Sequence, residues 1–205
     1  EIPKRDWSSD VCSSDLRNGV RLVPVINNEL FLSNKGYAGQ LGHTKVHGSN
    51  RLCTCGRRGC LNTEVSDVGL RVKLIEAVLA GGMPAFLERV GGDYTKISVN
   101  SFVDMAIEGD EPSLRLMRET AEYLGQSLGI ILDILAPRHI VLYGELIRGG
   151  DAFMQPLRES LAHNAIPDNF KHLTVIPCAA DENMGAYGAA TLVINRQFEF
   201  LKETV

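Results

Sequence analysis

The chain is organised around one short stretch, Cys53-Thr54-Cys55-Gly56-Arg57-Arg58-Gly59-Cys60, with His43 ten residues before it. Three thiols and one imidazole make a Cys₃His donor set, which suits tetrahedral Zn²⁺. Gly56 and Gly59 permit the positive φ angles that return the last cysteine to the first two. Thiolate donors exclude Mg²⁺ and Ca²⁺, which prefer oxygen. The stretch predicts a structural zinc site whose ligands are His43, Cys53, Cys55 and Cys60.

Two other arrangements of these cysteines remain open: a disulfide, or three thiols buried independently. The two cysteines of a Cys-x-Cys pair are poorly placed to form a disulfide with each other. Three thiols completed by one histidine are better explained by a metal with four ligands. A closed site with four protein ligands is normally structural. We therefore expect zinc to build the loop, and we assign no catalytic residue in this chain.

The residues around the stretch resemble the zinc signature of the ROK family. The resemblance is carried by Gly39-Gln40-Leu41-Gly42-His43-Thr44 and by Cys53-x-Cys55-Gly56-x-x-Gly59-Cys60-Leu61, and it extends over about residues 17–200. The family contains sugar-responsive transcriptional repressors and sugar kinases. The resemblance implies an α/β fold: the C-terminal lobe of an actin-like or hexokinase-like ATPase-type fold, with a mixed sheet, flanking helices and a zinc-stapled loop.

The resemblance also implies a sugar site beside the zinc loop. In the ROK pattern one glutamate stands three residues before the zinc histidine and another stands two after the last cysteine. Here these positions are Gln40 and Asn62. Amides still donate and accept hydrogen bonds, so we expect Gln40, His43 and Asn62 to bind the ligand. Glu64 can substitute for Asn62, but a solvated glutamate in a first helical turn is the simpler expectation.

A glycine follows the apolar run Ile140-Val141-Leu142, which predicts a buried strand. In ROK kinases the glycines after this strand line the nucleotide site, so Gly144 and Glu145 are the candidate cofactor-binding positions. Glycine after a strand is more often simple turn chemistry. Glu145 also brings bulk and negative charge to the place that a nucleotide phosphate approaches. This position therefore argues against ATP and favours a regulator.

Composition narrows the class of protein further. The 205 residues carry a net charge of −4, and phosphate contacts need a basic face. We expect contact with DNA only through an N-terminal domain absent from this chain. No apolar run reaches the roughly 20 residues of a membrane span. Five cysteines, three of them clustered, suit a reducing compartment, so we expect a cytoplasmic location and no membrane partner.

The first 16 residues show no apolar periodicity. The run from Arg5 to Leu16 resembles a translated sequencing adapter, and a polar, disordered tail is the alternative. We exclude residues 1–16 from the fold and expect residues 17–205 to form the ROK C-terminal lobe. The resemblance then implies that the first lobe, with its phosphate-binding motif and the catalytic Asp of the kinases, is absent, as is any DNA-binding domain.

Hydrophobic periodicity predicts the remaining elements. We expect strands over residues 20–26, 30–32, 139–143 and 173–176, and a short strand or extended segment over residues 43–46. We expect helices over residues 60–79, 84–90, 99–107, 113–135, 151–163 and 183–200. The helix over 113–135 has an apolar face broad enough for the core, and Gly125 and Gly129 allow a neighbour to approach closely.

The sequence therefore favours the effector-binding and oligomerisation portion of a sugar-responsive ROK repressor, with structural zinc. The alternative is an ATP-dependent sugar kinase that lacks its first lobe, and we lean against an enzyme. The expected partners are a sugar or sugar derivative and further copies of the same chain.

Overall fold

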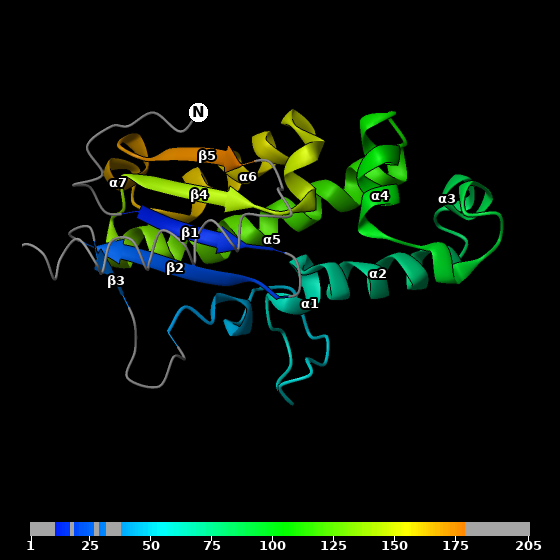
Figure 1. The fold of residues 1–205 in the computed structure, drawn as a ribbon, viewed down its shortest axis with the longest axis horizontal. Coiled ribbons are helices and arrows are strands. Elements are labelled where there is room, and N and C mark those ends of the chain that lie inside the picture. Colours follow the sequence, from blue (N-terminus) through cyan, green and yellow to red (C-terminus); the bar gives the residue numbers. More distant parts are fainter. Residues whose placement is uncertain (1–10, 17–18, 27–28, 32–37, 179–205) are drawn as a thin grey trace, which may run out of the picture.

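The fold is centred on a five-stranded sheet with strand order β3-β2-β1-β4-β5 (Figure 1). This computed structural model describes residues 11–16, 19–26, 29–31 and 38–178. The strands are parallel from β1 to β4 to β5 and antiparallel from β1 to β2 to β3. Their bounds are β1 Val11–Asp15, β2 Arg21–Ile26, β3 Glu29–Leu30, β4 His139–Tyr143 and β5 Thr174–Cys178. The prediction of a mixed α/β fold is confirmed.

The central strand β1 lies where the sequence predicted no structure. It pairs with β2 on one edge and with β4 on the other. Leu16, which follows it, is fully buried, and its N–H donates to the carbonyl of Tyr143 at 3.1 Å. The expectation of a disordered tail therefore does not hold for residues 11–16. The pairing on both edges is made by backbone groups, which every residue except proline carries in full. The strand could therefore form without the apolar periodicity that sequence analysis uses to predict strands.

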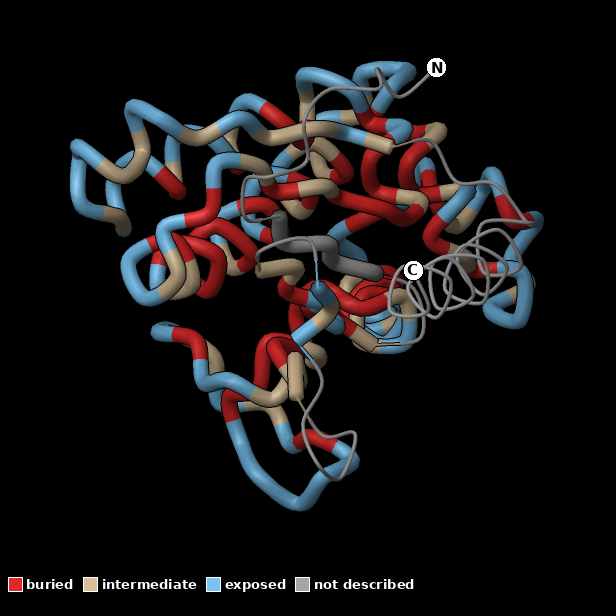
Figure 2. Tube along the Cα trace, turned by 60° about the vertical axis from the view of Figure 1, so that its left-hand side comes forward, coloured by how far each residue is buried: buried red, intermediate tan, exposed pale blue. Residues whose placement is uncertain are grey.

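The long helix α5, Glu111–Leu135, crosses behind the sheet, as the sequence predicted for a core helix (Figure 1). It packs along α6, Asp151–Asn164, and α7 covers Pro167–Lys171. A Cβ added to Gly125 would lie 2.4 Å from the Cβ of Ser160, so only glycine permits this approach. Figure 2 shows buried positions concentrated where the helices meet the sheet.

A second group of helices follows the zinc stretch: α1 Asn62–Val65, α2 Asp67–Leu79, α3 Pro84–Arg89 and α4 Val99–Ile107. The single helix predicted over 60–79 is wrong, because Ser66 is extended and its hydroxyl accepts from the N–H of Gly69 at 3.2 Å. Ser66 thus caps α2 and ends α1. None of the helices in the described ranges has the length and apolar character that crossing a bilayer demands.

Two other expectations concern the ends of this region. Residues 43–46 form no regular strand, but the extended segment that was the alternative is partly present: Leu41–His43 forms the 3-10 helix η1, Thr44 is extended, and Lys45 makes an isolated bridge to Cys60. The helix predicted over 183–200 lies outside the described residues. The segment that carries the three cysteines therefore lies between η1 and α1.

Candidate metal and ligand site

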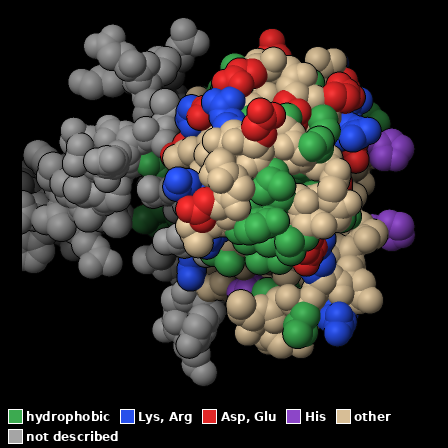
Figure 3. All heavy atoms as spheres, turned by 90° about the vertical axis from the view of Figure 1, so that its right-hand side faces the viewer, with side chains coloured by type: hydrophobic (Ala, Val, Ile, Leu, Met, Phe, Trp, Pro, Cys, Tyr) green, Lys and Arg blue, Asp and Glu red, His purple; other side chains and the backbone are tan. Residues whose placement is uncertain are grey.

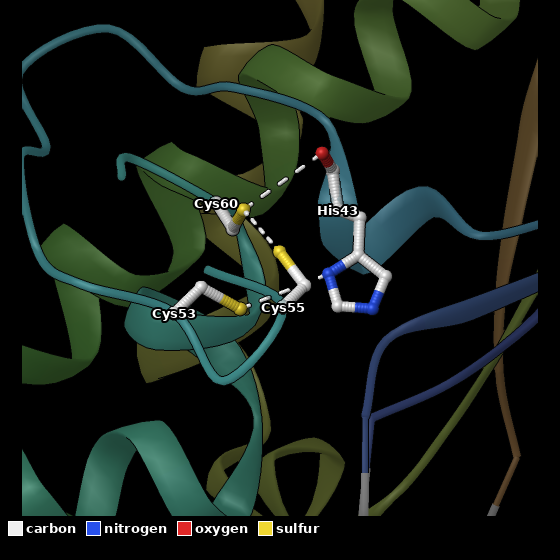
Figure 4. Close-up of side chains that lie close together, drawn as sticks. All are labelled: His43, Cys53, Cys55 and Cys60. Atoms are coloured by element: carbon white, nitrogen blue, oxygen red, sulfur yellow. Dashed lines mark hydrogen bonds between the residues drawn. The ribbon is translucent and has the colours of Figure 1, made fainter. Parts of the chain in front are cut away.

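Four donor atoms from two separate segments converge in one place (Figure 4). The ligand atoms of His43, Cys53, Cys55 and Cys60 all lie within 4.8 Å of one another. The Sγ atoms of Cys55 and Cys60 are 3.7 Å apart, and Cys53 Sγ is 3.7 Å from His43 Nδ1. Two Zn–S bonds of about 2.3 Å at the tetrahedral angle separate their sulfurs by about 3.8 Å. The observed spacing fits zinc, and the three thiols are not joined by a disulfide in this structure.

The loop that carries the thiols is closed by backbone hydrogen bonds. The N–H of Cys53 donates to the carbonyl of Arg57 at 2.8 Å, and the N–H of Gly56 donates back to Cys53 at 2.9 Å. Gly59 has a φ of 74°, and a Cβ there would lie 2.8 Å from the carbonyl oxygen of Ser49. Glycine is therefore required at position 59 for both backbone angle and space. This tight turn brings the first two thiols beside the third.

The thiols differ in how easily they ionise. The backbone N–H and then the side chain of Arg57 lower the pKa of the exposed Cys55 to about 6. Burial raises the pKa of Cys60 to about 12. A buried thiol resists deprotonation unless a cation lies beside it, and metal coordination deprotonates thiols outright. This arrangement of thiols therefore favours binding of a cation, which would deprotonate them, over three unliganded thiols.

A buried acidic group stands behind the zinc loop. Glu64 is 2% exposed, which contradicts the expectation of a solvated side chain. Its carboxylate lies 3.1 Å from Lys73 Nζ and 3.8 Å from Arg51 Nε, and it accepts a hydrogen bond from the hydroxyl of Ser49. Lys73 also contacts Glu119 at 2.7 Å. This network joins the loop to α2 and α5. Sequence spacing missed it because its members meet only through the tertiary fold.

The predicted ligand-binding residues Gln40 and His43 lie in the same turn. Gln40 is the residue before η1, and its carbonyl accepts from the N–H of His43 at 3.0 Å. Both side chains are half-buried. The Nδ1 atom of His43 faces Cys53, and its other ring nitrogen points away from the thiols (Figure 4). One imidazole can therefore face a metal and a ligand at once.

The third predicted residue, Asn62, lies next to this turn, and its side-chain oxygen is already hydrogen-bonded within the protein. Its Oδ1 accepts from the N–H of Val20 at 2.7 Å. Its side chain also fills the space above Gly42, where an added Cβ would lie 1.9 Å from that oxygen. Asn62 thus ties the start of β2 to α1, and its NH₂ group is what remains to meet a ligand.

Asn62→Ala should lower the free energy of unfolding by about 1–3 kcal/mol, because the part-buried N–H of Val20 loses its acceptor. Urea denaturation measures this loss. Asn62→Asp keeps an acceptor oxygen and is the matched control, so it should lose clearly less. Equal losses in the two variants would show that the hydrogen bond contributes nothing.

The predicted cofactor positions lie apart from the thiols, after β4. Gly144 has a φ of 142°, and a Cβ there would lie 3.0 Å from the Cβ of Leu16. Glu145 lies in the 3-10 helix η3, Glu145–Gly149, with its carboxylate 3.5 Å from Arg148. Arg148 is 2.6 Å from Asp104 of α4. The charge of Glu145 therefore belongs to a contact that joins η3 to α4.

Comparison with known proteins gives the family. The model described as ROK family matches residues 9–196. A xylose repressor from Bacillus spizizenii is 22% identical over 194 residues, which cover 95% of this chain and 46% of the repressor. The chain thus spans about half the length of the curated relatives it matches.

Solved structures agree on the fold. A ROK family transcriptional regulator, described as a homologue of the E. coli MLC protein, superposes with a TM-score of 0.75 at 21% identity, over 82% of this chain and 41% of that one. A ROK family glucokinase from Streptomyces griseus, in complex with glucose and AMPPNP, gives 0.76 at 24% identity, over 90% and 60%. The His/Cys cluster also fits the ROK zinc motif. The chain belongs to the ROK family.

Proposed function

We propose that this chain is the effector-binding portion of a sugar-responsive ROK repressor in which zinc is structural. The observation that carries the proposal is the convergence of His43 with three thiols in the turn that also holds Gln40. Repressors and glucokinases are both relatives, with a modest lean to repressors. Such a site needs reduced thiols, which fits the cytoplasm.

In this proposal zinc holds the loop in place and takes no part in a reaction. His43 holds the metal through Nδ1 and presents its second ring nitrogen to a sugar hydroxyl. Gln40 can both donate to and accept from a hydroxyl, and Asn62 donates through its NH₂ group. Neutral amides replace two carboxylates of the family pattern, so the ligand is a neutral sugar or sugar derivative bound through donors as well as acceptors.

Regulation then follows from a difference in ligand affinity between two arrangements of the protein. A sugar that binds one arrangement more tightly shifts the population toward it. DNA contact belongs to a part of the repressor outside this chain, because a net charge of −4 supplies no basic face.

A sugar kinase is the second candidate. It is favoured by the TM-score of 0.76 to the glucokinase that holds glucose and AMPPNP, and by Gly144 at the carboxyl end of β4. Against it, Glu145 keeps a carboxylate near the place where phosphate would bind. A kinase would also need a general base and Mg²⁺-bound nucleotide from outside this chain.

Calorimetry on the zinc-loaded chain separates the two. We expect binding of a neutral sugar from a panel of xylose, glucose and N-acetylglucosamine, and no heat with Mg²⁺–ATP. Gln40→Ala should weaken sugar binding about 5–10-fold, the effect of one hydrogen bond. Gln155→Ala, an exposed glutamine on α6, is the matched control. Binding of Mg²⁺–ATP would support the kinase, and a folded, zinc-loaded chain that binds no sugar would contradict the proposal.

A further inference from the structure

One of the three clustered thiols differs from the others in its exposure. Cys55 lies on the surface, whereas Cys53 is 5% exposed and Cys60 is fully buried. The segment around Cys55 projects below α1 in Figure 1 and forms the lower edge of the turned view in Figure 3. Oxidation of a thiol depends on access to its sulfur. A dissolved oxidant therefore reaches Cys55 before it reaches the other two.

The two buried thiols differ in what they contact. The Sγ of Cys60 is 3.7 Å from the Sγ of Cys55, and the Sγ of Cys53 is 3.7 Å from Nδ1 of His43. A sulfenic acid, the first product of thiol oxidation, condenses with a neighbouring thiol to form a disulfide. Cys60 is therefore the thiol placed to react with an oxidised Cys55.

We infer that Cys55 and Cys60 form a peroxide-sensitive pair whose oxidation releases the zinc. Cys55 is the thiol that a peroxide attacks, and Cys60 is the thiol that closes the disulfide. The inference rests on the zinc site of the proposed function. It adds a second chemical signal, besides a sugar, to which the loop responds.

The two steps balance in atoms and electrons. The thiolate of Cys55 attacks one oxygen of a peroxide ROOH, the O–O bond breaks, and the products are a sulfenic acid on Cys55 and RO⁻. The thiolate of Cys60 then attacks the sulfur of Cys55, the S–O bond breaks, and hydroxide leaves as the disulfide forms. Two electrons thus pass from the two thiolates to the peroxide. Only Cys53 and His43 remain as ligands, and structural zinc needs four.

The loop can accommodate this disulfide. A disulfide joins its sulfurs at about 2.05 Å, so the two sulfurs have to come about 1.7 Å closer. Residues 54–58 are all exposed, and a Cβ added to Gly56 would meet nothing within 4 Å. Packing therefore does not hold this end of the loop, and movement of Cys55 toward the buried Cys60 closes the distance.

Treatment of the zinc-loaded chain with hydrogen peroxide tests the inference. A dye that absorbs when it binds Zn²⁺ follows release of the metal, and tryptic peptides of the same samples are mapped by mass spectrometry. We expect one zinc ion released for each Cys55–Cys60 disulfide formed. Reduction with dithiothreitol followed by added zinc should restore the loaded chain, because both products are reducible by thiols.

The peptide map identifies the thiols that react. Trypsin cleaves after Arg57 and Arg58, between the two cysteines, so the disulfide joins peptide 52–57 to peptide 59–71. Fragmentation of the first peptide between Thr54 and Cys55 shows which of its two cysteines is joined.

Cys55→His keeps four ligands, because two thiols and two imidazoles also bind structural zinc. It lacks the thiol that the peroxide attacks, so its zinc should stay bound under conditions that empty the unchanged chain. Cys178→Ser, on β5 and outside the cluster, is the matched control and should release zinc as the unchanged chain does. If Cys55→His takes up no zinc, the peptide map of the unchanged chain decides alone.

Zinc that stays bound to the unchanged chain in excess peroxide would overturn the inference. Release with a disulfide through Cys53 instead of Cys55, or equally fast release from a zinc-loaded Cys55→His, would also overturn it. None of these measurements depends on sugar binding. A chain that loses zinc to peroxide as expected, but binds no sugar when loaded, would contradict the sugar site alone.

Discussion

Cys55→Ser releases the metal and loosens residues 38–66, while the sheet and the α5–α6 pair remain folded. A serine hydroxyl is a poor replacement for a thiolate ligand, and structural zinc sites bind with apparent free energies of about 10–16 kcal/mol. The loop of this protein has few apolar contacts of its own, since Cys55 and its neighbours to Arg58 are exposed. Its order should therefore depend on the metal.

Elemental analysis and hydrogen exchange measure the two parts of this result. Zinc should fall from one ion per chain to well below that, and amide protection should be lost over residues 38–66 only. Cys178→Ser, on β5 and outside the cluster, should keep its zinc. Full metal content in Cys55→Ser would contradict the assignment of this thiol as a ligand.

Glu64→Ala should lower the free energy of unfolding by about 3–5 kcal/mol, because it leaves the ammonium of Lys73 buried with only the half-exposed Glu119 as its carboxylate partner. Lys73 is 6% exposed and lies between Glu64 and Glu119, with its Nζ 5.3 Å from the centre of the Tyr123 ring. The hydroxyl of Ser49 would also lose its acceptor. Urea denaturation of the zinc-loaded chain measures the change.

Two further variants test whether the loss of stability comes from the buried charge of Lys73. Glu108→Ala removes a carboxylate whose ion pair with Arg89 is exposed, so the loss should be much smaller. Glu64→Ala combined with Lys73→Met removes the buried charge as well and should recover part of the stability. A double variant no more stable than Glu64→Ala would show that the buried ammonium is not the cause.

The sequence predicted the elements that depend on local pattern. The strand over 139–143 and the helix over 99–107 have the bounds expected, and α5 begins only two residues before its predicted start. The clustering of the three thiols follows for the same reason: a Cys-x-Cys pair and two glycines describe one tight turn. Spacing along the chain is enough where the neighbours in space are also neighbours in sequence.

The features that the sequence missed all depend on distant partners. β1 pairs with β2 and β4, and its sequence has no apolar periodicity from which this pairing could be predicted. Glu64 is buried because Ser49 and Lys73 arrive from the loop and from α2. The oxygen of Asn62 accepts from the N–H of Val20, 42 residues away, a contact that spacing did not indicate. Such contacts are set by the tertiary fold, which the spacing of residues does not encode.

The loop from His43 to Cys60 contributes residues to two parts of the surface. Gln40 and His43 border the proposed sugar site, and Leu52 and Cys53 line a groove of about 530 Å³ that Asn62 also borders. A single metal would hold both. Saturation with zinc would then set the threshold for sugar sensing, and a sugar that tightened the loop would strengthen zinc binding by the same factor that zinc strengthened sugar binding.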